Sequence, residues 1–159
     1  VVMVFALTLA RGSYVTYVEK ADRPLIEIDL PENEWTQVMD WAAERPVGTH
    51  FLVDPGHAWR YGSSVRAASG RDVYLEEIKD IGIAIYSSQI AERVSTRIAE
   101  LGNFSELDSN RARRLAHRYH LDYLITEHPI GLPLVHQQGP FNVYDLRADS
   151  RLALSFNND

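Results

Sequence analysis

Hydrophobic and polar positions alternate along the chain with periods that predict both strands and helices. Leu25–Leu30 alternates apolar and acidic residues, which is the two-residue period of a half-exposed strand. A helix is predicted between Pro31 and Pro46, because the apolar positions there fall at i, i+3, i+4 and i+7. Those positions are Trp35, Val38, Met39 and Ala42.

Two further helices and five further strands follow from the same patterns. One helix begins at Ser87 or Ser88 and ends at Gly102, and another begins at Asp108 or Ser109, since serine and aspartate cap helices and glycine ends them. Their apolar faces are Ile90, Val94, Ile98 and Leu101, and then Ala112, Leu115, Ala116 and Tyr119. The strands are Phe51–Val53, Arg71–Glu77, Tyr123–Thr126 and a hairpin of 134–136 with 141–144.

Strands that alternate with helices predict an α/β fold. We expect a single domain with a mixed, mostly parallel sheet flanked by helices, a C-terminal hairpin, and the end of a membrane helix at the N-terminus. The predicted organisation is the end of a transmembrane helix or a membrane-proximal segment over 1–18, a soluble α/β domain over 25–146 and a polar tail over 147–159.

The first ten residues contain no charge and are followed by Arg11. Ten apolar residues are about half the length of a membrane-spanning helix, and Tyr14 and Tyr17 are aromatics of the kind found at a membrane boundary. We interpret this run as the second half of a spanning helix, while an ordinary buried strand or helix is the alternative.

Composition narrows the function classes. The chain of 159 residues has a formal charge of -6, with only two lysines and with its arginines spread along the sequence. Nucleic-acid binding, which depends on clustered cations, is therefore not expected. The absence of cysteine excludes disulfides, thiolate metal sites and cysteine nucleophiles.

Polar side chains follow two of the predicted strands. Asp54 comes directly after Phe51–Val53, with His57 three residues later, and Glu127 and His128 follow Tyr123–Thr126. If the two strands are parallel, these groups meet at the carboxyl edge of the sheet, where α/β proteins bind ligands. Such a set suits a divalent metal or acid–base chemistry. In the alternative, Asp54 caps its own loop and the histidines are solvated.

Asp54 with Glu77 and Lys79 also matches the Asp…Glu-x-Lys pattern of metal-dependent nucleases. On a strand, residues two apart share a face, so Glu77 could hold Mg²⁺ while Lys79 activates water. The pattern is short, and the acidic net charge opposes a nucleic-acid substrate.

Two arginines flank the small residues Ala67–Gly70. Arg66 and Arg71 could hold a phosphate or carboxylate, with Lys79 nearby. They could equally pair with the acidic residues Glu76, Glu77 and Asp80 and so brace a long loop.

From about Asp29 to Leu146 the chain resembles the soluble C-terminal domain of bacterial polytopic membrane proteins, many of which look like membrane glycosyltransferases that use lipid-linked sugars. The resemblance is carried by Trp35, Trp41-Ala42, Pro46, Phe51–Pro55, Ser64–Arg66, Gly70-Arg71, Lys79-Asp80, Tyr86-Ser87, Asp122–Ile125 and Phe141–Leu146.

That resemblance implies an extracytoplasmic accessory or substrate-binding domain of an integral membrane protein. Its partners would be the membrane-embedded part of the same polypeptide and a lipid-linked sugar or glycan. The catalytic acids of this class usually lie upstream, so it implies no complete catalytic site and no cofactor here, with any divalent metal in the parent protein. The candidate ligand-facing residues are Asp54, His57, Arg66, Arg71, Lys79, Glu127 and His128. A metal-dependent nuclease or hydrolase and a purely structural interaction module are the alternatives.

Overall fold

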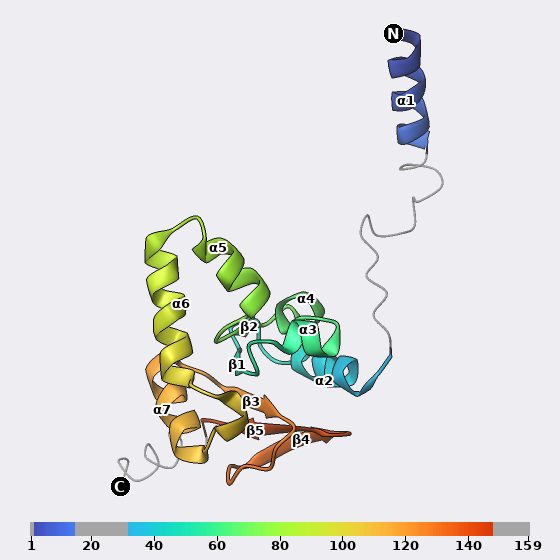
Figure 1. Ribbon diagram of the computed structural model, residues 1–159. Coiled ribbons are helices and arrows are strands. Elements are labelled where there is room, and N and C mark those ends of the chain that lie inside the picture. The colour runs from blue at the N-terminus through green and yellow to red at the C-terminus, as the bar shows by residue number, and fades with distance from the viewer. Residues whose placement is uncertain (1, 15–31, 148–159) are drawn as a thin grey trace, which may run out of the picture. The chain divides into compact units, whose positions relative to one another are not determined.

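A computed structural model describes residues 2–14 and 32–147. The chain divides into two units, 1–30 and 31–159, which are described separately (Figure 1). In the first unit the apolar run forms helix α1 (Val2–Tyr14), with Arg11 in its last turn. Within the described residues, no helix combines the length and the apolarity needed to cross a membrane. The predicted strand at 25–30 and the polar tail from 148 lie outside the described residues.

The second unit is built on one five-stranded sheet of order β2-β1-β3-β5-β4. Its strands are β1 (His50–Leu52), β2 (Asp72–Val73), β3 (Tyr123–Thr126), β4 (Leu134–Gln138) and β5 (Phe141–Asp145). β1 is parallel to both β2 and β3, whereas β5 is antiparallel to β3 and β4.

The prediction of an α/β fold with a mixed sheet is confirmed, but the prediction of a mostly parallel sheet is wrong. Each parallel ladder pairs two residues per strand, while each antiparallel ladder pairs four. The reason is the hairpin, which turns at Gly139-Pro140: β5 pairs with β3 in antiparallel direction, and β4 pairs with β5 in antiparallel direction at the edge of the sheet.

Successive side chains of β1 and β3 point to opposite faces of the sheet and pack into two hydrophobic cores, one on each face. Phe51, Tyr123 and Ile125 belong to one core, and Leu52 and Leu124 belong to the other. The first core is completed by residues of α2 (Glu34–Ala43) and α4 (Val65–Ser69), next to the short helix α3 (His57–Tyr61). The second is completed by residues of α6 (Ser88–Leu101) and α7 (Ser109–Tyr119).

The helix ends follow local chemistry. The Asn33 side chain caps α2, Ser87 caps α6 and Asp108 caps α7, each accepting a hydrogen bond from a backbone N–H of the first turn. The predicted starts of α6 and α7 are therefore confirmed, and so is the end of α6 at Gly102.

The segment predicted as a strand over 71–77 is strand only at Asp72–Val73, so that prediction is wrong over its second half. The chain continues as a π-helix, η2 (Glu77–Ile81), and then as α5 (Gly82–Ala84). A 3₁₀ turn, η3 (Phe104–Glu106), connects α6 to α7. The change at 77 decides where Glu77 and Lys79 point.

Candidate functional site

The two polar segments predicted to meet at the sheet edge do meet. β1 and β3 are adjacent and parallel, so the residues that follow them emerge at the same end of the sheet. Asp54, Glu127 and His128 line one small hollow there, together with Tyr61 and Phe141. The hollow encloses about 20 Å³, which is room for about one water molecule.

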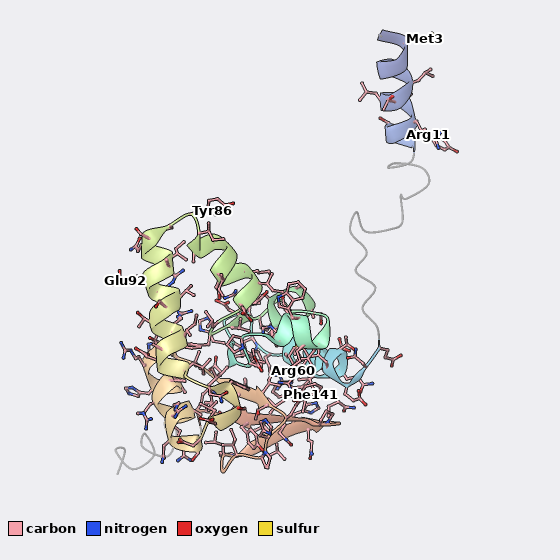
Figure 2. The ribbon with its side chains drawn as sticks, viewed as in Figure 1. Met3, Arg11, Arg60, Tyr86, Glu92 and Phe141 are labelled. Atoms are coloured by element: carbon pink, nitrogen blue, oxygen red, sulfur yellow. The ribbon has the colours of Figure 1, made fainter. Side chains whose placement is uncertain are left out.

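A shared arginine joins the two carboxylates. Arg60 Nη1 lies 3.3 Å from Asp54 Oδ2, and Arg60 Nη2 lies 2.9 Å from Glu127 Oε2. Arg60 lies on α3 (Figure 2), and its side chain is among those that line the hollow. The cation is about half exposed and each carboxylate is 27% exposed, so all three groups remain accessible to a ligand. One cation between two carboxylates leaves the cluster with a net negative charge.

Asp54 also caps its own loop, as the alternative interpretation of the sequence expected. Its Oδ1 accepts a hydrogen bond from the backbone N–H of Gly56 at 2.8 Å, which closes the turn after β1. Its two oxygens are therefore divided between the loop and Arg60, and the carboxylate is held in a fixed orientation at the edge.

Tyr61 adds a hydroxyl to this cluster. Burial, followed by the neighbouring Glu127 carboxylate, raises the pKa of Tyr61 to about 12. Tyr61 is thus a neutral hydrogen-bond donor throughout the physiological range.

A larger groove adjoins the hollow and shares Asp54, Phe104 and Ser105 with it. Its volume is about 350 Å³, at the lower end of the range for small-molecule sites. The groove has polar groups from Asp54, Glu77 and Asn103 and an apolar wall that includes Phe104 and Ile98. The combined surface offers hydrogen-bonding groups and an aromatic side chain to one ligand.

His57 does not face this surface, contrary to the prediction. It is fully buried, and its Nδ1 lies 2.8 Å from the backbone oxygen of Asp54 while its Nε2 accepts a hydrogen bond from the Val65 N–H. Burial lowers the pKa of His57, which keeps the ring neutral with Nδ1 as the donor. His57 therefore connects the two loops behind the site, whereas His128 is exposed as the alternative expected.

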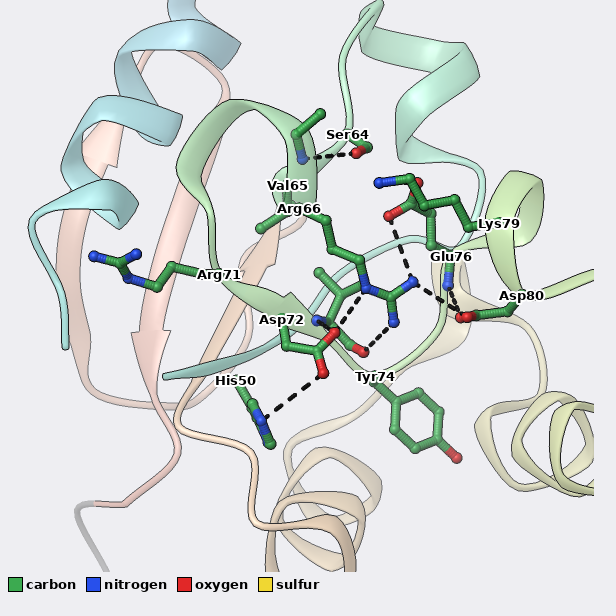
Figure 3. Close-up of polar contacts among 12 residues, drawn as sticks. His50, Ser64, Val65, Arg66, Arg71, Asp72, Tyr74, Glu76, Lys79 and Asp80 are labelled. Carbon is green, nitrogen blue, oxygen red and sulfur yellow. Dashed lines mark hydrogen bonds and ion pairs between the residues drawn. The ribbon is translucent and has the colours of Figure 1, made fainter. Parts of the chain in front are cut away.

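Arg66 is the centre of a separate ion network, which Figure 3 shows. Its guanidinium lies 2.7 Å from Asp72 Oδ1, 3.2 Å from Asp80 Oδ1 and 3.7 Å from Glu76 Oε2. Lys79 Nζ lies 3.9 Å from the other oxygen of Glu76, whose side chain is only 1% exposed. The bracing role considered for Arg66 is therefore observed, with Asp72 in place of Glu77.

Arg71 points away from that network in Figure 3 and closes the end of α2. Its Nε donates to the Arg45 carbonyl at 2.8 Å and its Nη2 to the Ala43 carbonyl at 2.5 Å. Its Nη1 donates to the carbonyls of Ser69 and Gly70. These bonds satisfy carbonyls that a helix end leaves free, and they account for Arg71 without a ligand.

The nuclease-like set is only partly assembled. Asp54 Oδ1 and Glu77 Oε2 both lie about 3.5 Å from the position that a Cβ on Gly56 would occupy, so these carboxylates are near each other. Lys79, however, pairs with Glu76, because η2 is helical and residues two apart do not share a face of a helix. Among residues 2–14 and 32–147, no group of three or more acidic or histidine side chains is arranged to hold a metal ion.

Sequence reasoning missed Arg60, which is the residue that joins the site. Its partner Glu127 is 67 residues away in the sequence, and no spacing connects the two. The one available signal in the sequence is that Arg60 lies six residues after Asp54, in the segment that directly follows the first predicted strand of the sheet edge. Comparisons with protein-family models, with curated protein sequences and with solved structures return no match.

Proposed function

We propose that residues 32–147 form a carbohydrate-binding accessory domain of a membrane-attached, glycosyltransferase-like protein. The observation that carries the proposal is the Asp54–Arg60–Glu127 bridge at the carboxyl edge of the parallel strands β1 and β3, beside a groove of about 350 Å³. The proposal assigns binding to this domain and leaves bond-making chemistry to another part of the polypeptide.

A sugar matches the chemistry of this surface. Vicinal hydroxyls donate hydrogen bonds to carboxylate oxygens and accept them from a guanidinium, so one sugar could engage Glu127 and Arg60 together. The Tyr61 hydroxyl supplies a further polar contact. The apolar face of a pyranose ring packs on an aromatic side chain, and Phe104 lines both the hollow and the groove.

Membrane attachment on the extracytoplasmic side is supported by the resemblance to polytopic membrane proteins and by the uncharged run that forms α1. Met3, Leu7 and Leu9 are between 57% and 76% exposed on that helix. Exposed aliphatic side chains on a helix are expected where lipid replaces water. A lipid-linked sugar would then reach the domain from the membrane surface.

Saturation-transfer NMR on the whole chain tests the proposal with a panel of hexoses, N-acetylhexosamines and short oligosaccharides. We expect transfer to the ring protons of at least one class, at millimolar to micromolar affinity, because only a few polar groups converge at the site. No transfer to any of these sugars, with a folded protein, would overturn the proposal.

A further inference from the structure

An uncharged, exposed tip is an apolar feature among residues 32–147 that the proposed function does not use. Residues 81–91 contain no charged side chain, in a chain of which 24% is charged. They form the last residue of η2, α5, the turn after it and the start of α6. Four of the ten large exposed hydrophobic side chains among residues 32–147 fall within this tip, and they are Ile81, Ile83, Ile85 and Tyr86.

Exposure increases toward the turn. Ile83 is 52% exposed, Ile85 is 78% exposed and Tyr86 is 90% exposed, whereas Ala84 and Ile90 pack against the core. Figure 2 shows Tyr86 at the turn between α5 and α6, away from the sheet, with Glu92 further along α6. The feature is therefore a protruding tip whose buried face anchors it and whose outer face is apolar.

Several backbone groups of this tip are hydrogen-bonded within it. The Tyr86 N–H donates to the Ile83 carbonyl at 3.0 Å and the Ser87 N–H to the Ala84 carbonyl at 3.4 Å. The Ser87 hydroxyl accepts from the Ile90 N–H and so closes the first turn of α6. Internal hydrogen bonds of this kind are the condition for a chain segment to enter a medium without water.

We propose that the 81–91 tip inserts into the interfacial layer of a lipid bilayer. A bilayer accepts a convex apolar tip without a complementary groove, and the lack of charge removes the main cost of entry. The terminal tyrosine suits the boundary between headgroups and hydrocarbon. The exposed aliphatic side chains of α1 show that the same chain carries a second lipid-compatible surface.

The inference deepens the proposed membrane attachment, and it is independent of sugar binding. It gives the polypeptide a second contact with the membrane, in addition to the contact proposed for α1. Lipid contact at two segments also restricts how far the domain moves from the bilayer.

Depth measurements by spin-label EPR test the inference, and the absence of native cysteine makes single labelling specific. The full chain carries a nitroxide at Ile85→Cys, at the control Val47→Cys or at Met3→Cys in α1, and is reconstituted in phosphatidylcholine vesicles. Val47 is 81% exposed, so it matches Ile85 in both apolarity and exposure.

On reconstitution we expect the label at 85 to gain collisions with oxygen and to lose collisions with a water-soluble nickel chelate, while the label at 47 changes in neither. A label at 85 that stays as accessible to nickel as the label at 47 would overturn the inference, even if the label at 3 is protected and membrane attachment stands. Protection of the label at 85 without vesicles, growing with protein concentration, would assign the tip to a second copy and would also overturn it.

Discussion

Removal of the Arg66 guanidinium tests whether the ion network around Glu76 is structural. In Arg66→Met the buried Glu76 carboxylate keeps only Lys79, whose Nζ is 3.9 Å away. Leaving a buried charge without its partner costs about 3–5 kcal/mol of unfolding free energy. Urea unfolding followed by circular dichroism should show this loss as a lower midpoint.

Arg118→Met is the matched control. Arg118 pairs with Glu100 at 2.9 Å but is 64% exposed, so its removal should cost under about 1 kcal/mol. Adding Glu76→Gln to Arg66→Met removes the buried charge that has lost Arg66 and should recover part of the loss. Equal, small effects of the Arg66 and Arg118 substitutions would refute the structural reasoning.

Arg66→Met should also change how the free energy of unfolding depends on pH in acid. Burial alone would raise the pKa of Asp72, but hydrogen bonds from Arg66 and from the Val73 N–H bring it below its usual value. A lowered folded-state pKa contributes stability above about pH 4 that disappears as the pH falls through the folded value. Arg66→Met should therefore show a flatter loss of stability below about pH 4 than the wild-type chain.

Two further predictions concern buried and turn positions. Burial lowers the pKa of His57, so the stability of the wild-type chain should fall as the pH drops below about 6.5. His57→Gln should remove this part of the pH dependence, which unfolding at pH 5 and at pH 8 measures. A stability difference between the two pH values that is the same in the variant and the wild-type chain would contradict the prediction. Gly139→Ala should lower the stability of the fold by about 1 kcal/mol or more beyond the effect of Gly70→Ala. Both glycines have a positive φ, but only a Cβ at 139 would lie 2.6 Å from the Glu34 side chain. Equal thermal midpoints of the two variants would show that Glu34 moves aside freely.

The alternation of apolar runs and helical faces predicted most of the second unit. The apolar run at 51–53 and the mostly apolar run at 123–126 are each followed directly by an acidic residue, and this pattern located the sheet edge where Asp54 and Glu127 meet. Capping residues such as Ser87 fixed the helix starts, because a hydroxyl acceptor is needed there. These features depend on a few neighbouring residues, which is why sequence was enough.

The features that sequence did not predict depend on distant partners. From the sequence, His57 is a loop residue that could face a ligand or the solvent; its burial depends on the hydrogen bond from the Val65 N–H, eight residues away. From the sequence, Arg71 is a candidate ligand-binding cation; in the structure its guanidinium donates to carbonyls at the end of α2. The Asp…Glu-x-Lys interpretation required a strand at 77–79, and the observed π-helix separates Glu77 from Lys79.

The most direct test of the carbohydrate-binding proposal is a calorimetric titration of the best sugar from the NMR panel into two matched variants. Glu127→Gln alters the carboxylate 2.9 Å from Arg60 at the site, and Glu100→Gln alters a carboxylate 2.9 Å from Arg118 outside it. We predict that Glu127→Gln weakens binding about tenfold or more, since a hydrogen bond to a charged group is worth about 1.5–3 kcal/mol, and that Glu100→Gln leaves it unchanged. Equal affinity of both variants and the wild-type chain would contradict the assignment of sugar binding to the Asp54–Arg60–Glu127 edge.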